Sequence, residues 1–515
     1  MHTDTFLSHL QIDPDKIRPD DWEVDWNNAP YPFKIYQDRP KIALSHEIPL
    51  SFQKKTGNLS LDKLGCFLWC VFGITKVVYA TYPAHIDDIP HTATMYRRFV
   101  PSGGALYPNE LYLYIKLNDI PPGIYHYDAA HHSLVLLREG NYDAYLANAL
   151  GNRCDISDCF ATIFVSIFFW KNFFKYHNFA YRLQGLDSGV VIGQLLEVAK
   201  QTSFDTTIYY QFLDEQINHL LGLSTEKESI YAVIPMASSL SIQSDTFTED
   251  KITEVPVISH NYHMKSKKLI PYPDLQRIHL QSIQQEIKAF PSIQRTKPIF
   301  QTKKQITPLP PCRSHLPPFL ETCRSRVSPG ADFTKKTVTL EQLSTLLHTV
   351  RDATSHSNDL SEHADHPFYH LTIAGYLYEV EEVSNGLYCY NPANHSLQLI
   401  QEGDFRFYFQ QSMTHQHINL FQVPICLHIL GDPLLGTEYL GTRAYRIRQM
   451  ETGILVQRLL LAASSIGFGG HPLLGYNTKM IDQLYQIQDQ KETTLIQIPI
   501  GPFHLRGKIE ANIHN

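Results

Sequence analysis

The stretch YRLQGLDSGVVIGQLLEVAK (residues 181–200) returns as YRIRQMETGILVQRLLLAAS (445–464), 264 residues further along the chain. A second pair, GIYHYDAAHHSLVLLREG from Gly123 and GLYCYNPANHSLQLIQEG from Gly386, repeats at an offset of 263. Two matches at nearly one spacing indicate an internal duplication, and a period this long indicates a repeated domain because solenoid repeats are far shorter. We therefore expect two related halves that form an intramolecular pseudo-dimer within a single chain.

The composition suits two globular domains, with 515 residues of which 43% are hydrophobic and 18% charged, and a formal net charge of −7. A net negative charge argues against a nucleic-acid-binding protein, which usually has a basic surface. No run approaches the ~18 apolar residues of a membrane helix, and we find no signal peptide. Eight cysteines without a CxxC pair favour reduced thiols and a cytoplasmic protein. The 26 histidines come without HExxH or paired CxxC, so no metal site is predicted.

The hydrophobic pattern predicts an α+β fold with a mostly antiparallel sheet in each half. Apolar spacing predicts a helix at 59–73 and a counterpart at 338–350. CFATIFVSIFFW (159–170) indicates a buried central strand because both faces are apolar. SGVVIGQLLEVAKQT (188–202) is a helix that is apolar nearly all round, which predicts burial between layers. Residues 1–55 are expected to form an extended lead-in.

The predicted division has a first domain at 1–240, an insert with a Pro-rich linker at 241–318, and a second domain at 319–515. Within the insert, PDLQRIHLQSIQQEIKAF (273–290) predicts a bridging helix that begins at its proline. The segment QTKKQITPLPPCRSHLPPF (301–319) is rich in proline, which predicts a stiff linker rather than a folded domain.

The most specific local signal is PSGGALYP (101–108). Its adjacent glycines allow the backbone to approach a flat ligand and expose amide donors, while Ser102 adds a hydroxyl. An ordinary tight turn before a strand is the alternative. The matching segment of the second half (364–371) reads ADHPFYHL and lacks both glycines. A purely structural turn would be needed in both halves, so the loss favours a binding role.

PSGGALYP, the strand after it, Lys175-Tyr176 in FFKYHNFAYR and a YR…(D/E)xG helix together resemble the SagB/ThcOx-type branch of the nitroreductase flavoproteins. The resemblance covers roughly residues 30–240 and 320–505. It implies two nitroreductase-like α+β domains with FMN in their interface, each site drawing residues from both. The activity it implies is oxidation of peptide thiazolines or oxazolines to thiazoles or oxazoles, with FMN as hydride acceptor.

The two halves have lost different parts of the implied site. RSRVS (324–328) fits the family's phosphate motif, since guanidinium groups bind phosphate through a bidentate fork, whereas the first half has SHEIP (45–49). IGFGGH (466–471) resembles the family's loop over the flavin ring, whereas the first half has TSFD (202–205). One FMN per chain is therefore expected, in a composite site. The implied cofactor-binding residues are Pro101, Ser102, Gly103, Gly104, Leu106, Tyr107, Arg324, Ser325, Arg326, Ser328, Phe468, Gly469, Gly470, Arg506 and Lys508.

Lys175 and Tyr176 are the implied catalytic pair. Hydride loss from one ring atom requires proton removal from its neighbour, and a desolvated lysine has a pKa low enough for this while a tyrosine can relay or position the proton. The second half has Tyr439-Leu440 at the aligned positions. His177 departs from the family, which usually has glycine there, and Lys171 is an alternative base.

Two other functions fit the same residues. One is NAD(P)H-dependent reduction of a nitroaromatic or quinone, and the other is a catalytically silent scaffold subunit of a peptide-modifying complex. The Lys-Tyr pair favours dehydrogenation because nitro reduction requires no substrate deprotonation. The expected partners are a peptide substrate and a cyclodehydratase or carrier-bound protein, without nucleic acid or membrane. Asp187 and Glu451 recur at matching positions, where we expect helix capping and interface pairing.

Overall fold

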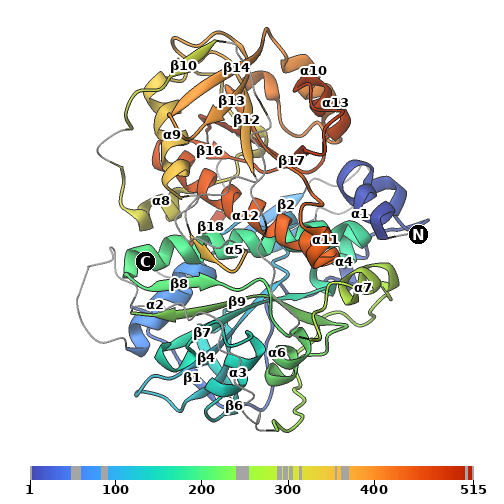
Figure 1. Ribbon diagram of the computed structural model, residues 1–515, viewed down its shortest axis with the longest axis vertical. Helices are drawn as coiled ribbons and strands as arrows, with labels where there is room; N and C mark the ends of the chain where they lie inside the picture. The colour runs from blue at the N-terminus through green and yellow to red at the C-terminus, as the bar shows by residue number, and fades with distance from the viewer. Residues whose placement is uncertain are drawn as a thin grey trace.

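In the computed structural model, two β-sheets lie at opposite ends of the molecule with long helices between them (Figure 1). The structure describes residues 3–47, 60–82, 91–238, 254–286, 293, 300, 305–312, 316–353, 356–360, 371–504 and 509–512. This arrangement is the predicted α+β architecture, with an antiparallel sheet and flanking helices in each half.

The sheet of the first half is antiparallel except at one edge, where a two-residue strand from the second half pairs in parallel. In spatial order its strands are β1 (Lys41–Ala43), β6 (Ser133–Glu139), β5 (Gly123–Asp128), β4 (Asn109–Ile115), β7 (Ala161–Phe168), β9 (Glu228–Ala237), β8 (Asp205–Ile208) and β11 (Ser357–Asn358). As predicted, β7 is central and fully buried.

The sheet of the second half repeats the order of the first seven of these strands, without a counterpart of β11 among the described residues. Its strands are β10 (Ile306–Pro308), β14 (Ser396–Glu402), β13 (Gly386–Asn391), β12 (Thr372–Leu377), β15 (Ile425–Gly431), β17 (Thr493–Gly501) and β16 (Gly469–Gly470). The register shift in the β5–β6 hairpin, at Ile124/Tyr125, recurs in the β13–β14 hairpin at Leu387/Tyr388, which is the spacing of the sequence repeat. Bulges are built-in features, so their recurrence supports one folding plan for both halves.

A third sheet joins the two halves. It contains β2 (Lys76–Tyr82), β3 (His91–Arg97) and β18 (Ile509–Asn512), and β18 pairs with β2 in antiparallel register. The helices are α1 (Thr3–Ile12), α2 (Leu61–Phe72), α3 (Asp143–Ala149), α4 (Trp170–Tyr176), α5 (Ala180–Thr202), α6 (Asp214–Leu221), α7 (Pro273–Leu280), α8 (Phe319–Ser325), α9 (Leu340–Ala353), α10 (Arg406–Ser412), α11 (Thr437–Leu440), α12 (Thr442–Ser465) and α13 (Thr478–Leu484).

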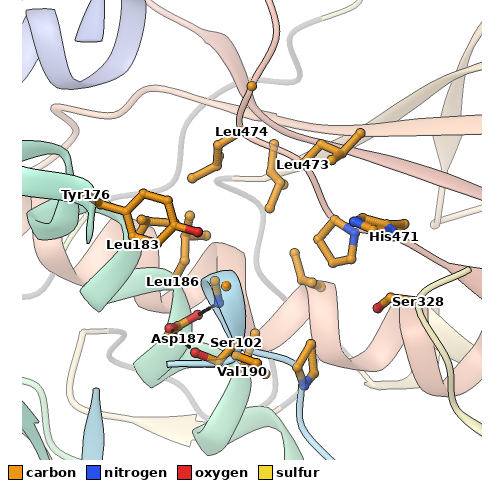
Figure 2. A pocket seen from close by; sticks show the side chains of 18 of the residues that line it. Ser102, Tyr176, Leu183, Leu186, Asp187, Val190, Ser328, His471, Leu473 and Leu474 are labelled. Atoms are coloured by element: carbon orange, nitrogen blue, oxygen red, sulfur yellow. Dashed lines mark hydrogen bonds between the residues drawn. The ribbon is translucent and has the colours of Figure 1, made fainter. Parts of the chain in front are cut away.

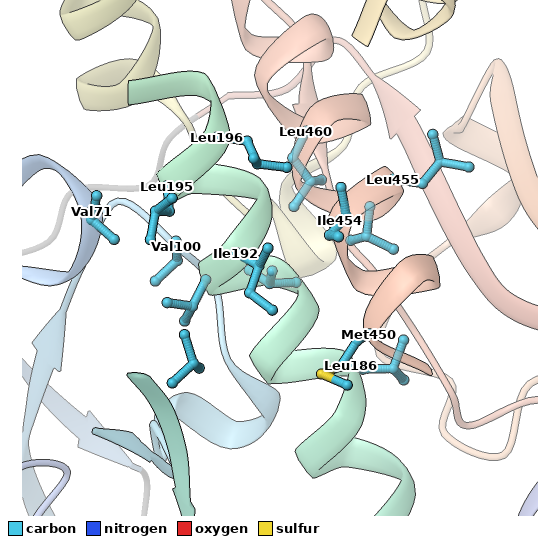
Figure 3. Packing of buried hydrophobic residues seen from close by; sticks show 14 of the residues in the cluster. Val71, Val100, Leu186, Ile192, Leu195, Leu196, Met450, Ile454, Leu455 and Leu460 are labelled. Carbon is cyan, nitrogen blue, oxygen red and sulfur yellow. The ribbon is translucent and has the colours of Figure 1, made fainter. Parts of the chain in front are cut away.

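The repeated helices α5 and α12 cross at the centre of the molecule and are buried on nearly every side (Figure 3). Glycine makes this crossing possible. A Cβ atom added to Gly189 would lie 1.9 Å from the Met450 carbonyl oxygen, and one added to Gly453 would lie 2.2 Å from that of Leu186. Around this contact pack aliphatic side chains, each contributing roughly 1.5–3 kcal/mol by burial. The two glycines stand 264 residues apart, at matching positions of the repeat. The residues that allow the two helices to cross closely are therefore present in both copies.

Two helices differ from the sequence expectation. Residues 3–12 form α1 within the predicted extended lead-in, and the predicted bridging helix at 273–290 ends already at Leu280. Near the end of α1 the Gln11 side chain donates to the Thr494 carbonyl of the second half (3.1 Å). After α7 the Gln284 amide donates to Asp214 of the first half (2.9 Å). The predicted insert thus contains a short helix, α7, and a segment that contacts the first half.

None of the helices in the described ranges combines the length and apolar character needed to cross a bilayer. The described residues also hold no group of three or more His, Cys, Asp or Glu suited to a metal ion.

Candidate active site between the two halves

A cavity of about 1690 Å³ lies between the halves and is lined by both (Figure 2). The first half contributes the 101–107 turn, the end of α4 and one face of α5, whereas the second contributes residues 323–328 and the loop 471–479. Predicted site residues that line the cavity are Pro101, Ser102, Gly103, Gly104, Tyr107, Lys175, Tyr176, Arg324, Ser325, Arg326 and Ser328. The fold therefore brings together the groups that the sequence places in separate halves.

The glycine turn faces the Lys-Tyr pair directly. Gly104 has φ of 64°, in the left-handed region that favours glycine. A Cβ atom added there would lie 2.7 Å from the Tyr176 hydroxyl and 2.9 Å from Lys175 Nζ. Both functional groups therefore converge on the backbone of this turn, and only a residue without a side chain leaves room for them.

Burial shifts the pKa of both members of the pair. It lowers the pKa of Lys175, whose Nζ lies 4.9 Å from the Tyr176 ring centroid and 5.3 Å from that of Trp26. It raises the pKa of Tyr176 to about 12, with a further contribution from the Asp187 carboxylate. Near neutral pH the tyrosine is therefore a hydrogen-bond donor, while the lysine releases its proton more readily than an exposed lysine does.

Asp187 was assigned only capping and pairing by its sequence position, but it lies inside α5 and lines the cavity. Its carboxylate accepts hydrogen bonds from the Ser102 hydroxyl (2.7 Å) and the Gly103 amide (3.3 Å). The Ser102 oxygen in turn accepts from the Tyr107 amide (2.9 Å). Burial raises the pKa of Asp187 to about 7 against these bonds. The available signal was an acidic residue between apolar positions (Leu186 and Val190) on one face of this helix.

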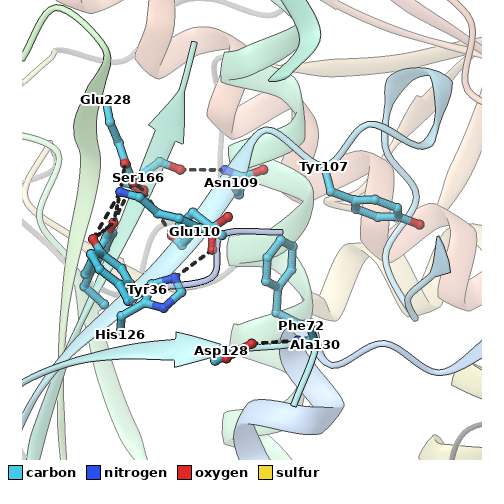
Figure 4. A network of polar contacts seen from close by, with 12 residues as sticks. Tyr36, Phe72, Tyr107, Asn109, Glu110, His126, Asp128, Ala130, Ser166 and Glu228 are labelled. Carbon is cyan, nitrogen blue, oxygen red and sulfur yellow. Dashed lines mark hydrogen bonds and ion pairs between the residues drawn. The ribbon is translucent and has the colours of Figure 1, made fainter. Parts of the chain in front are cut away.

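Lys171, the alternative base, lies outside this cavity wall and is 2% exposed. Its Nζ pairs with the Glu110 carboxylate and donates to the Tyr107 carbonyl (3.2 Å). Burial opposes ionisation of Glu110, but Lys171 and His126 outweigh it and hold its pKa at about 2. The surrounding network, which includes Glu110 and His126, is shown in Figure 4. Lys171 therefore supports the glycine turn from behind and is not a free base.

The arginines predicted to bind phosphate lie where α8 ends. Arg326 Nε donates to the Phe99 carbonyl (2.6 Å), which ties this segment to the first half. Arg324 Nη2 and Arg326 Nη1 are buried and have no hydrogen-bond partner among the described residues. Arg97 and Arg98 also line the cavity and were missed in the sequence. Unpaired buried guanidinium nitrogens are costly unless an acceptor binds them, so this wall suits an anion.

Other predicted residues lie elsewhere. Leu106, Phe468, Gly469 and Gly470 are absent from the cavity wall, and Arg506 and Lys508 lie outside the described residues. The two glycines instead allow close packing: a Cβ atom on Gly469 would lie 2.2 Å from Pro329, and the Gly470 amide donates to the Val327 carbonyl (3.3 Å). They support the arginine segment from outside, and His471 to Gly475 line the cavity next to them.

On the opposite side of the pseudo-dimer, charge pairs occupy the equivalent positions. Glu451, the counterpart of Asp187, is paired with Arg448, and Arg443 and Arg446 both contact the Asp214 carboxylate. All are buried. The counterparts of the Lys-Tyr pair are Tyr439, which is 60% exposed, and Leu440.

Comparison with known proteins agrees with this architecture. Residues 324–502 match the Nitroreductase family. A Methanocaldococcus jannaschii protein named as a nitroreductase is 25% identical over 170 residues, which are 33% of this chain and 84% of that protein. Proteins of the family generally bind FMN, so the match supports an oxidoreductase.

Solved structures extend the comparison along the chain. The crystal structure of an Anabaena variabilis protein, also named as a nitroreductase, superposes with a TM-score of 0.73 at 21% identity over 98% of this chain and 99% of that one. A chain of the Escherichia coli microcin synthetase McbBCD complex with truncated pro-MccB17 bound covers 39% of this chain and 68% of that chain, at 19% identity and a TM-score of 0.27, a likeness too partial to bear on function. The chain therefore has a nitroreductase-like α+β fold throughout, and its residues 324–502 are similar to the Nitroreductase family.

Proposed function

We propose that this chain is an FMN-dependent dehydrogenase of the SagB/ThcOx type, which oxidises thiazoline or oxazoline rings of a peptide to thiazole or oxazole. One observation carries the proposal: Lys175 and Tyr176 of one half line the same cavity as Arg324 and Arg326 of the other. Such an enzyme needs a proton-accepting Lys-Tyr pair and an anion-binding wall for the FMN phosphate in the same cavity.

The cavity suits FMN and leaves space for a substrate. Small-molecule sites occupy roughly 300–1,000 Å³, so a cavity of about 1690 Å³ can hold a flavin with a peptide segment beside it. The unpaired guanidinium nitrogens of Arg324 and Arg326 would hold the phosphate. The backbone at Gly103 and Gly104 would lie close to the flat ring system.

The chemistry is loss of one hydride and one proton from adjacent ring atoms. A bound flavin would supply the two-electron oxidation by accepting the hydride. Lys175 in its neutral form takes the proton, and burial favours that form by lowering its pKa. Tyr176 keeps its proton at neutral pH and donates a hydrogen bond beside the amine, which orients the substrate ring against Gly104.

We further propose one cofactor per chain and the domain division 1–240, 241–318 and 319–515, with α7 acting for the second half as α1 acts for the first. The Arg443–Asp214–Arg446 cluster supports a single site because the Asp214 carboxylate already contacts both arginines there. A tandem duplication explains this single composite site if the first half then lost the phosphate-binding arginines and the second half lost the glycine turn and the Lys-Tyr pair.

Two measurements test this function. The purified protein is expected to be yellow, with absorbance near ~450 nm from bound flavin. Incubation with an azoline-bearing peptide should lower the peptide mass by about 2 Da, the loss of two hydrogens. Lys175→Ala should retain the flavin and abolish the mass change. A colourless protein, or azole formation by Lys175→Ala, would contradict the proposal.

The name of the archaeal relative favours a second function, reduction of nitroaromatics or quinones by NAD(P)H. This reaction needs no proton abstraction from the substrate. Nitroreductase activity that survives Lys175→Ala, without azole formation by the unmodified protein, would support it instead.

A further inference from the structure

His177 follows the Lys-Tyr pair and has a backbone conformation that histidine rarely adopts. It ends α4 with φ of 44° and ψ of −139°. This region is close to one that is populated almost only by glycine, because a Cβ atom crowds the neighbouring carbonyl groups.

The second half shows what this turn requires. Gly441 stands 264 residues later, ends α11 and has φ of 56° and ψ of −142°. In both turns the amide donates to the carbonyl four residues earlier, at Phe173 or Thr437. The two turns have the same geometry, so the fold favours glycine at both positions and the first half carries a strained histidine instead. Strain of this kind persists where the side chain serves a purpose.

The imidazole of His177 lies at the cavity. It lines the wall together with Lys175 and Tyr176, and packs edge-on against Trp22 with ring centroids 6.1 Å apart. Its Nδ1 is buried and has no hydrogen-bond partner among the described residues. Burial and Arg18 lower its pKa to about 4, against Asp15, so the ring is neutral at neutral pH and is a weak base there. It therefore suits hydrogen bonding better than proton abstraction.

We propose that His177 is a substrate-positioning residue, whose Nδ1 forms a hydrogen bond with a backbone amide of the peptide that carries the reacting ring. This inference rests on the proposed function, since it places a peptide beside the Lys-Tyr pair. The bond satisfies a buried polar atom that is otherwise unpaired, which is why the strained turn is retained. Asparagine presents a polar atom close to the position of Nδ1 and tolerates positive φ, so it is the conservative replacement.

The test compares His177→Gly, His177→Ala and His177→Asn in the full-length, flavin-loaded protein. The probe is a tripeptide amide with a central thiazole, and its Kd is measured from the change in flavin absorbance. His177→Gly and His177→Ala should raise the Kd at least tenfold while the flavin content stays that of the unmodified protein. His177→Asn should restore binding to within about threefold, as expected if one hydrogen bond is retained.

Stability gives a readout that needs no ligand. His177→Gly should unfold at a higher urea concentration than both the unmodified protein and His177→Ala, because only glycine relieves the backbone. Equal Kd values in all variants, absence of probe binding, or no gain in stability for His177→Gly would overturn the inference. Failure of the proposed function looks different: the protein lacks flavin, or the azoline peptide binds and is not oxidised.

Discussion

Replacing Asp187 with asparagine should remove a pH dependence of stability that comes from burying a carboxylate. Burial raises the pKa of Asp187 from 3.8 to about 7, although Ser102 and Gly103 donate hydrogen bonds to it. An acid whose pKa is raised by folding stabilises the protein below its unfolded-state pKa. That contribution is lost as pH rises through the folded-state value.

The magnitude follows from these two pKa values. With 3.8 in the unfolded chain and about 7 in the folded protein, proton linkage gives a loss of about 2.6 kcal/mol in unfolding free energy between pH 5 and pH 8. Asparagine is neutral at both values and has no such dependence. It also accepts one fewer hydrogen bond, which costs about 1 kcal/mol at either pH and so cancels in the comparison.

The assay is urea unfolding at pH 5 and pH 8 of protein stripped of bound small molecules. The stability of Asp187→Asn relative to the unmodified protein should rise by about 2.6 kcal/mol between the two pH values. Asp489→Asn, at an exposed position, is the matched control and should show no comparable change. Other titrating groups are shared and cancel. A change below about 1 kcal/mol for Asp187→Asn would refute the reasoning.

Three substitutions test other parts of the structure. Gly189→Ala should lower the urea midpoint sharply or prevent folding, because its Cβ would lie 1.9 Å from the Met450 carbonyl oxygen. Gly104→Ala should retain flavin but lower turnover at least tenfold, since the methyl group displaces the Tyr176 hydroxyl and strains a positive φ. Arg326→Leu should weaken FMN binding roughly 10- to 100-fold in a fluorescence titration, as expected for loss of a charge-assisted hydrogen bond.

Two of these have a control within the chain, Gly189→Ala and Arg326→Leu. Gly475→Ala should unfold like the unmodified protein, because its Cβ would meet its nearest neighbour at 3.7 Å. Arg277→Leu removes a partly exposed arginine that is not part of the cavity wall and should leave FMN affinity unchanged. Normal stability of Gly189→Ala, full turnover of Gly104→Ala, or unchanged affinity of Arg326→Leu would each contradict the corresponding argument.

Much of the architecture could be predicted from the sequence because the internal repeat shows the same pattern of elements in both halves. The repeat around 181–200 and 445–464 predicted the two buried helices, and the apolar run at 159–170 predicted the central strand β7. Helix α1 was missed because its ten residues are too few for a clear period beside Asp13-Pro14, although Phe6, Leu7 and Leu10 become buried once they dock.

The site was harder to predict because side-chain environment is set by packing between distant segments. Lys175 was the predicted base and Lys171, four residues before it, the alternative; the structure pairs Lys171 with Glu110 and places Lys175 at the cavity. Glycine also serves more than one purpose: Gly104 leaves space for functional groups, whereas Gly469 and Gly470 pack against neighbouring segments. Sequence alone does not separate these roles.

The pairing of β18 with β2 has a consequence for how the protein is made. Lys76, where β2 begins, lines the cavity, but the strand beside it consists of residues 509–512. A ribosome must therefore synthesise more than 400 further residues before this sheet can close. This part of the cavity wall is therefore completed only after the second half of the chain has been synthesised.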